Sequence, residues 1–191
     1  MNINEEIKTL LTQTKRPGMD GLLNWMDASG FYNAPCSSKF HLAKPGGLAE
    51  HSLNVCRTAC AMVESFYLKQ GKPFTQEFLD SVVISALLHD LGKAGQFGKP
   101  GYIIEKILTD ETPSPYPIPV YATNKELLYV PHEVRSIAIA SKFIDLTEEE
   151  QFAILYHNGL YGELEGFKGK EIPLYLIIHF ADMWAARVIE E

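Results

Sequence analysis

Residues 86–95 read ALLHDLGKAG, and this stretch decides how the rest of the chain is interpreted. A strongly apolar segment ends on His89 and Asp90 and then breaks at Gly92 and Lys93. Two explanations are open: the pair is a polar edge on a buried helix, or the helix presents two ligands to a site. The choice depends on whether other parts of the chain supply partner residues.

Length and composition indicate a globular chain with one hydrophobic core. The chain has 191 residues, of which 46% are hydrophobic and 21% charged, and its formal net charge is −7. This length suits one substantial core, so we expect a single domain over residues 1–191. Duplex nucleic acid is not an expected partner, because its binding rests on many Lys and Arg contacts to phosphate. A small phosphate-containing substrate is compatible with this charge, since a metal ion and one or two cations can hold it.

Cysteine use and apolar stretches predict a reduced, cytoplasmic setting without a membrane span. The three cysteines form no CxxC pair and no even disulfide framework, and we interpret Cys56 and Cys60 as packing residues. The first residues, MNINEEIKTLL, lack the basic region of a secretory signal. The longest apolar stretch, residues 172–189, carries His179 and Asp182 and is too polar for a membrane span.

Hydrophobic periodicity predicts a mostly α fold, a helical bundle with one elaborated connection. We expect helices over residues 3–14, 19–29, 47–69, 75–91, 132–144, 147–157 and 173–190. Thr75, Thr147 and Pro173 are typical helix-start residues, and Glu150 completes a capping box with Thr147. Residues 95–130 are rich in proline, glycine and aromatic side chains. We interpret them as an irregular insertion with a small β-hairpin, lying over the helical core.

Two aspartates lie where a structural role is hard to justify. Asp90 continues the buried stripe of its helix, and Asp182 lies within LYLIIHFADMWAARVI with no Lys or Arg three or four positions away. Burying an ionised carboxylate without a partner costs several kcal/mol, even after relaxation. Each aspartate therefore needs a cation, and a metal ion would serve.

Three histidines besides His89 extend this set. His51 falls on the apolar side of its helix, His132 begins a helix and His157 ends one, and each alone is compatible with a core or capping role. Together with the HD pair and Asp182 they give six candidate metal ligands: His51, His89, Asp90, His132, His157 and Asp182. Four imidazoles and two carboxylates suit two borderline transition metals such as Mn, Fe, Ni, Co or Zn. The helix would then end on His-Asp because a carboxylate there can bridge two ions, and Gly92 would let the chain turn away.

This ordered spacing resembles the HD-domain superfamily of metal-dependent phosphohydrolases, in which HDLGK is the most recognisable segment. The similarity extends over roughly residues 40–187. It includes the HD part of YhaM-like 3′–5′ exoribonucleases and single-domain bacterial or phage-borne HD proteins, where GGLAEHSLNV, PH-x-x-x-S, FI-x-LT-x-EE and YH-x-G occur in this order. The resemblance implies an HD core over residues 41–187, with the helices of residues 1–40 packed on it.

The resemblance also implies roles for individual residues. The first metal ion would be held by His51, His89, Asp90 and Asp182, and Asp90 would bridge to a second ion held by His132 and His157. A metal-bridging hydroxide would be the nucleophile. Asp90 and Lys93 are the candidate catalytic residues, and Lys93 would contact the substrate phosphate. His41 and Arg135 are further candidate substrate contacts, although His41 is equally compatible with an ordinary loop position.

We therefore expect a hydrolase that cleaves a phosphoester bond of a nucleotide or short oligonucleotide. Two alternatives stay open: a single-strand 3′–5′ nuclease, and a non-catalytic nucleotide-binding or regulatory HD module. No GYP segment follows HDLGK, which argues against a cyclic di-GMP phosphodiesterase. A complete set of six ligand positions favours catalysis over the module.

Overall fold

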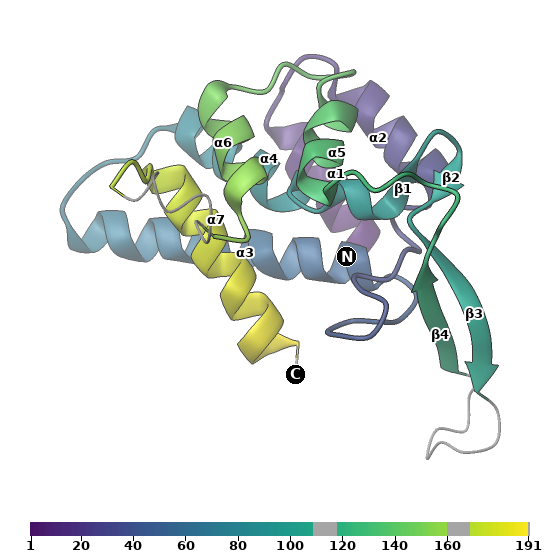
Figure 1. The fold of residues 1–191 in the computed structure, drawn as a ribbon. Coiled ribbons are helices and arrows are strands. Elements are labelled where there is room, and N and C mark those ends of the chain that lie inside the picture. Colours follow the sequence, from purple (N-terminus) through teal and green to yellow (C-terminus); the bar gives the residue numbers. More distant parts are fainter. Residues whose placement is uncertain (109–117, 160–168, 191) are drawn as a thin grey trace.

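The computed structural model describes residues 1–108, 118–159 and 169–190. In these residues the chain forms a helical bundle from which one β-hairpin projects (Figure 1). The helices are α1 (Ile3–Gln13), α2 (Met19–Ser29), α3 (Gly47–Lys69), α4 (Gln76–Leu88), α5 (His132–Ala140), α6 (Glu148–Tyr156) and α7 (Pro173–Trp184). A 3-10 turn follows α4 at Leu91–Ala94, and a π-helical turn follows α7 at Ala185–Ile189. The predicted mostly α fold with a small β insertion is confirmed.

Helix α3 forms the base of the bundle, and α4 and α7 pack against it. Its buried face includes Leu48, Val55, Ala59 and Val63 at helical spacing, as an amphipathic helix on a core requires. Each fully buried side chain of this kind contributes about 1.5–3 kcal/mol relative to exposure. Helix α1 contacts α3 and α4. The division into residues 1–40 and 41–187 within one domain stays a prediction.

The predicted helix starts are confirmed by their capping contacts. The Thr75 side chain accepts a hydrogen bond from Phe78 N, and Thr147 forms a complete capping box with Glu150. Glu150 is fully buried and also pairs with Arg16, at 2.6 Å from Nη2 to Oε1. This buried contact joins the segment between α1 and α2 to α6.

Three predicted helices end earlier than expected. Helix α4 ends at Leu88, and at Asp90 the backbone has already left the helical region (φ −102°, ψ 8°) before the 3-10 turn. Helix α5 ends at Ala140 and α7 gives way to the π-helical turn after Trp184. Hydrophobic periodicity did not reveal these ends, because a 3-10 or π turn continues the same apolar face for several residues.

The insertion contains two antiparallel pairs, β1 (Gly95–Gln96) with β2 (Lys99–Pro100) and β3 (Tyr102–Leu108) with β4 (Ile118–Thr123). The expectation that it lies over the core was wrong, because β3 and β4 extend away from the helices (Figure 1). Ile103 and Ile104 are 44% and 55% exposed. Neighbouring strand residues point to opposite faces, so neither face of the hairpin is covered there.

Candidate metal centre

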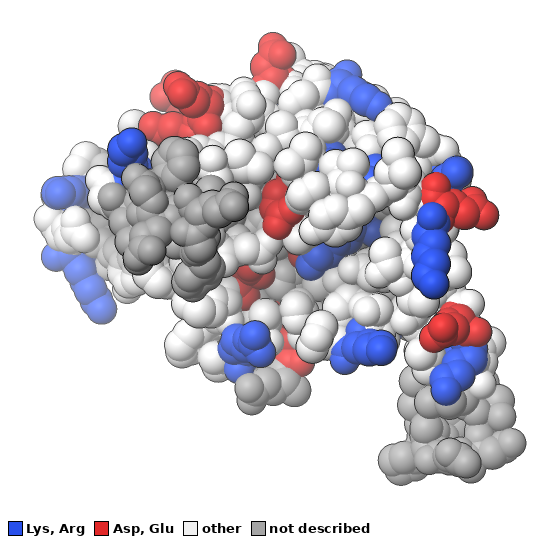
Figure 2. All heavy atoms as spheres, in the orientation of Figure 1, with Lys and Arg blue, Asp and Glu red and all other residues white. Residues whose placement is uncertain are grey.

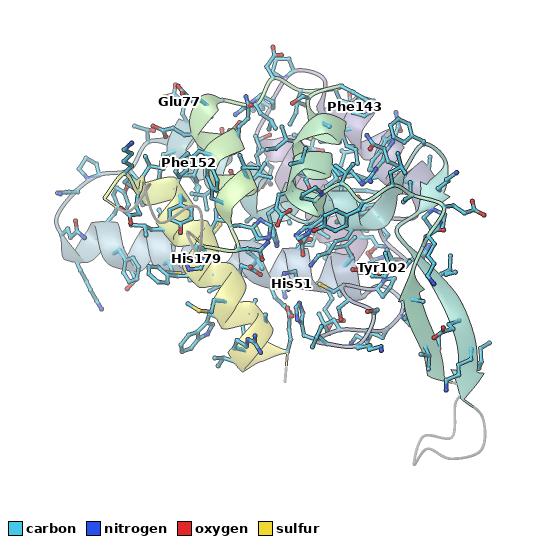
Figure 3. The ribbon with its side chains drawn as sticks, in the orientation of Figure 1. His51, Glu77, Tyr102, Phe143, Phe152 and His179 are labelled. Atoms are coloured by element: carbon cyan, nitrogen blue, oxygen red, sulfur yellow. The ribbon has the colours of Figure 1, made fainter. Side chains whose placement is uncertain are left out.

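The six predicted ligand residues come together between the helices. They are His51 from α3, His89 and Asp90 from the end of α4, His132 from the start of α5, His157 from the end of α6 and Asp182 from α7. His51 on α3 and His179 on α7 border this central region (Figure 3). Segments up to 131 residues apart in the chain therefore contribute to one cluster, and Asp90 lies at its middle.

One oxygen of Asp90 faces the first group of ligands. Oδ2 lies 3.6 Å from His51 Nε2 and 3.5 Å from His89 Nε2. Asp182 closes this side, with Oδ1 3.0 Å from His51 Nε2 and 3.9 Å from His89 Nε2. Two imidazole nitrogens and two carboxylates thus surround one position. Lys93 also reaches Oδ2, with its Nζ at 2.6 Å.

The other oxygen of Asp90 faces the second group. Oδ1 lies 3.0 Å from His132 Nε2 and 3.7 Å from His157 Nε2, and the two imidazole nitrogens are 3.5 Å apart. Oδ1 is buried, and within the described residues it accepts no hydrogen bond of acceptable geometry. A buried oxygen in that state is costly unless a cation satisfies it. The donor set around Asp90 therefore fits two metal positions that share its carboxylate.

Backbone contacts turn the ligand nitrogens towards Asp90. His89 Nδ1 donates to the Ala86 carbonyl and His157 Nδ1 donates to the Ile154 carbonyl, each at 2.8 Å. Because a carbonyl oxygen only accepts, each Nδ1 carries the hydrogen and each Nε2 keeps a free lone pair for a metal. His179 Nδ1 in turn lies 2.7 Å from the His157 carbonyl, so α7 supports the end of α6.

Glu190 is a part of the site that sequence reasoning missed. Its Oε2 lies 3.0 Å from His51 Nδ1, and Asn54 donates to its Oε1 at 3.0 Å. A carboxylate on the far nitrogen of a metal-binding histidine orients the ring and raises its basicity. Helical spacing from Asp182 gave no signal for this contact, because the π-helical turn at Ala185–Ile189 changes the direction of the chain before Glu190.

The close approach of the 3-10 turn (Leu91–Ala94) to α5 explains Gly92 differently from the sequence analysis. Gly92 does not adopt a left-handed φ, and it lies within the 3-10 turn Leu91–Ala94. A Cβ at this position would lie 2.3 Å from the His132 carbonyl oxygen. Ser136 links the two segments by accepting from Gly92 N and donating to His89 O, both at 2.8 Å. Glycine is needed here for close packing beside a ligand, and not for a turn.

His157 and Asp182 have the charge states that metals bind, whereas His51 carries a proton. Burial, followed by the nearby His89, lowers the pKa of His157 to about 3, so its imidazole is neutral. Burial disfavours the carboxylate of Asp182, but the hydrogen bond from His51 and the neighbouring His89 hold the pKa of Asp182 well below its usual range. Burial alone would lower the pKa of His51, yet its hydrogen bonds to Asp182 and Glu190 raise that pKa to about 9. A metal ion that binds His51 Nε2 therefore has to displace the proton from that nitrogen.

An open cleft of about 760 Å³ leads to this cluster. Among the described residues that line the cleft, the lysine and arginine are Lys93 and Arg187. Tyr102, Thr123 and Asn158 also line it. Both acidic and basic side chains border the hollow in the middle of this face (Figure 2). Lys93 therefore lies where the sequence analysis expects it, at the cleft, but in this structure its ammonium is paired with Asp90.

The other two predicted substrate contacts have different surroundings. Arg135 is only 5% exposed, and it donates to Gln96 Oε1 at 2.8 Å and to the Leu128 carbonyl at 3.1 Å. These contacts favour a structural role for Arg135 over the expected substrate contact. His41 lines the cleft, and its Nε2 lies 3.3 Å from Cys36 Sγ. Cys36 was the second residue that sequence reasoning missed, because a single cysteine in a loop carries little signal.

The HD domain model matches residues 48–182 of the chain. The chain therefore belongs to the HD-domain superfamily, whose members are generally metal-dependent phosphohydrolases. The matched region contains all six candidate ligand residues, from His51 to Asp182. Neither a comparison with curated proteins nor one with solved structures gives a match. Among the described helices, none combines the length and apolar character needed to cross a bilayer.

Proposed function

We propose that this protein is a phosphohydrolase that cleaves a phosphoester bond of a nucleotide or short oligonucleotide with the help of two divalent metal ions. The observation that carries the proposal is the position of Asp90, whose two oxygens face two separate groups of imidazoles. A carboxylate placed in this way is suited to hold two ions side by side.

The residues divide naturally between the two positions. His51, His89, Asp90 and Asp182 would hold one ion, and Asp90, His132 and His157 would hold the other. When bound, such ions activate water and neutralise charge on phosphoryl oxygens. The mixed nitrogen and oxygen donor set suits Mn, Fe, Co, Ni or Zn.

Lys93 is the residue that we propose to act on the substrate directly. Burial would lower its pKa, but the neighbouring Asp90 carboxylate outweighs this and raises the pKa of Lys93, so the ammonium stays charged. Its side chain is 17% exposed and lines the cleft. A fixed cation at this place can bind a phosphoryl oxygen and stabilise the charge that develops there.

The cleft supports a nucleotide-sized substrate. Its volume of about 760 Å³ lies within the range of small-molecule sites, roughly 300–1,000 Å³. Lys93 and Arg187 offer positive charge for phosphate, while Tyr102 and Asn158 offer an aromatic ring and an amide for a base or sugar.

One observation favours a single-strand nuclease as the second candidate. A neighbouring cleft of about 640 Å³ shares Lys93, Tyr102, Thr123 and His132 with the first, so the two clefts adjoin. The second cleft is lined by Tyr129, which is 94% exposed. Exposed aromatic rings along a groove are typical stacking positions for successive bases.

A hydrolysis assay with purified protein tests the proposal. The panel contains nucleoside mono-, di- and triphosphates, cyclic nucleotides, and short RNA and DNA oligomers, each with Mn²⁺, Fe²⁺, Co²⁺, Ni²⁺ or Zn²⁺. Asp90→Ala should abolish turnover, while Asp20→Asn, an exposed substitution on α2, should retain it.

The outcomes separate the candidates. Turnover of mononucleotides supports the main proposal, and stepwise shortening of oligomers supports the nuclease. If the wild-type protein binds metal but hydrolyses no substrate in the panel, the non-catalytic module is the better description. Activity that persists equally in Asp90→Ala would come from a contaminant and would contradict the proposal.

A further inference from the structure

A cysteine and a histidine lie directly beside the first metal position, outside the six ligands. Cys36 Sγ lies 3.3 Å from His41 Nε2 and 4.0 Å from Asp90 Oδ2. The rings of His41 and His51 have their centroids 4.9 Å apart. One ligand atom from each of Cys36, His41 and His51 lies within 4.8 Å of the other two.

These separations fit a shared metal ion. With a metal–sulfur bond of about 2.3 Å and a metal–nitrogen bond of about 2.0 Å, a sulfur and a nitrogen that are neighbours on one ion lie roughly 3–3.5 Å apart. The Cys36–His41 distance of 3.3 Å agrees with this value. The Cys36 side chain is completely buried, so its sulfur faces the cluster and not the solvent.

The loop before α3 is built to hold this pair in place. Cys36 N donates to the Leu42 carbonyl at 3.1 Å, and Ser37 Oγ donates to the His41 carbonyl at 3.0 Å. These bonds close residues 36–42 into a small ring. The ring rests on the first turn of α3, where a Cβ at Gly47 would lie 2.0 Å from the Leu42 carbonyl oxygen. The loop is thereby fixed to the helix that carries His51.

We propose that Cys36 and His41 are additional ligands of the metal ion held by His51, which gives this centre a thiolate donor. Both residues lie outside residues 48–182, the region that matches the HD domain model. They are therefore features of this chain beyond the matched region. The inference depends on metal binding at His51, but it goes beyond the proposed hydrolysis and does not depend on it.

The chemistry of binding is simple and balanced. The S–H bond of Cys36 breaks, a metal–sulfur bond forms, and the proton passes to solvent, as thiolate ligation requires. Burial raises the pKa of the Cys36 thiol well above its usual range, and Lys93 Nζ, 4.0 Å from the sulfur, only partly opposes this, so the thiolate would form together with the metal–sulfur bond. A sulfur donor shifts the preference of the centre from Mn²⁺ towards softer ions such as Zn²⁺ and Co²⁺.

Cobalt titration tests this inference with a readout that does not depend on activity. Co²⁺ added to the metal-free protein should produce visible d–d bands together with a near-ultraviolet sulfur-to-cobalt charge-transfer band. Cys36→Ser should lose the charge-transfer band and keep the d–d bands. His41→Ala should retain the charge-transfer band but change the shape of the d–d bands and lower the affinity for Co²⁺.

The chain offers a matched control, because it has only three cysteines. The double variant Cys56→Ala/Cys60→Ala leaves Cys36 as the single thiol and should keep the charge-transfer band at full intensity. In a parallel zinc titration, Cys36→Ser should bind Zn²⁺ about 10-fold or more weakly, a loss at the lower end of that seen for residues around metal sites. Its affinity for Mn²⁺ should change less.

Each result has a distinct meaning. If wild-type protein shows d–d bands without the charge-transfer band, Cys36 is not a ligand and this inference is wrong, while the metal centre stands. If no cobalt bands develop at all, both the inference and the proposed metal centre are wrong. The wild-type spectrum alone decides these cases, so a variant that fails to fold does not leave the question open.

Discussion

At the scale of residues, Glu190 lies outside the matched region and contacts His51, one of the candidate metal ligands. The carboxylate of Glu190 accepts from His51 Nδ1 at 3.0 Å while His51 Nε2 faces the metal position. Such a contact holds the ring in one tautomer and one orientation. Among the other candidate ligands, His132 Nδ1 lies 3.5 Å from the Glu133 carboxylate, whereas His89 and His157 are held by backbone carbonyls and have no such charge at Nδ1.

Glu190→Gln is therefore expected to weaken metal binding. The amide keeps the size of the side chain and one acceptor but removes the negative charge, so affinity should fall about 10–100-fold. Isothermal titration with Zn²⁺ measures this directly. Glu64→Gln, at an exposed position on α3, is the matched control and should bind like the wild type. Equal affinities for the two variants would show that Glu190 has no influence on the centre.

Lys93 is a second residue for which a substitution has a clear expected effect. Unlike Glu190, it should affect catalysis and not metal binding. Lys93→Gln should lower kcat/KM by about 10²–10³-fold, the usual loss when one charge-stabilising donor is removed. Metal content should be close to that of the wild type, because Lys93 is not a ligand in the proposed centre. Steady-state kinetics and metal analysis of the same preparation check both parts. A variant with normal kcat/KM would remove Lys93 from the proposed mechanism.

At the scale of elements, the candidate site depends on how closely the 3-10 turn after α4 approaches α5. Gly92 lies where this turn meets the start of α5, with no room for a Cβ against the His132 carbonyl. Ser136 joins the same two segments by two hydrogen bonds. The packing of the turn on α5 therefore holds the two proposed metal positions together.

Gly92→Ala should push the 3-10 turn and α5 apart. The added methyl group has to displace the backbone of α5, so we expect a loss of about 1–3 kcal/mol in the free energy of unfolding, typical of overpacking. Binding at the position of His132 and His157 should weaken most. Denaturant unfolding and metal titration measure the two effects. Ala138→Ser, exposed on α5, serves as the control and should be nearly neutral. A fully stable Gly92→Ala protein would contradict this account of the glycine.

At the scale of the whole molecule, a metal ion would join segments from α3 to α7. The ligands lie on different helices, so an unfolded chain cannot present them together. Any ion that binds only the folded state stabilises it by mass action, by about 2.7 kcal/mol at a concentration 100 times Kd. Metal binding should thus be visible as resistance to unfolding.

Thermal unfolding with and without Zn²⁺ measures this linkage. The Tm of the wild-type protein should rise by several degrees with metal, and a chelator should reverse the change. Asp90→Ala should show a much smaller shift, because it removes the carboxylate that both positions share. A similar increase in both proteins would indicate binding elsewhere on the surface.

Sequence reasoning succeeded where the signal is local or follows from the order of residues. Thr75 and Thr147 cap the predicted helices, because capping depends on a few adjacent residues. The six candidate metal ligands could be proposed because a buried aspartate or inward histidine contrasts with its apolar neighbours, and the structure places them in one cluster. The HD domain match over residues 48–182 agrees with this set.

What the sequence by itself determined is thus the helical class and the family, and it predicted a set of metal ligands that the structure brings together. Only the tertiary structure decided that Glu190 supports His51, that Cys36 and His41 adjoin the centre, and that the β3–β4 hairpin projects from the bundle. Those features depend on distances between residues remote in the chain and on turns such as Ala185–Ile189. Helical periodicity describes the face of one helix, and it contains no information about which loop or terminus packs beside that face.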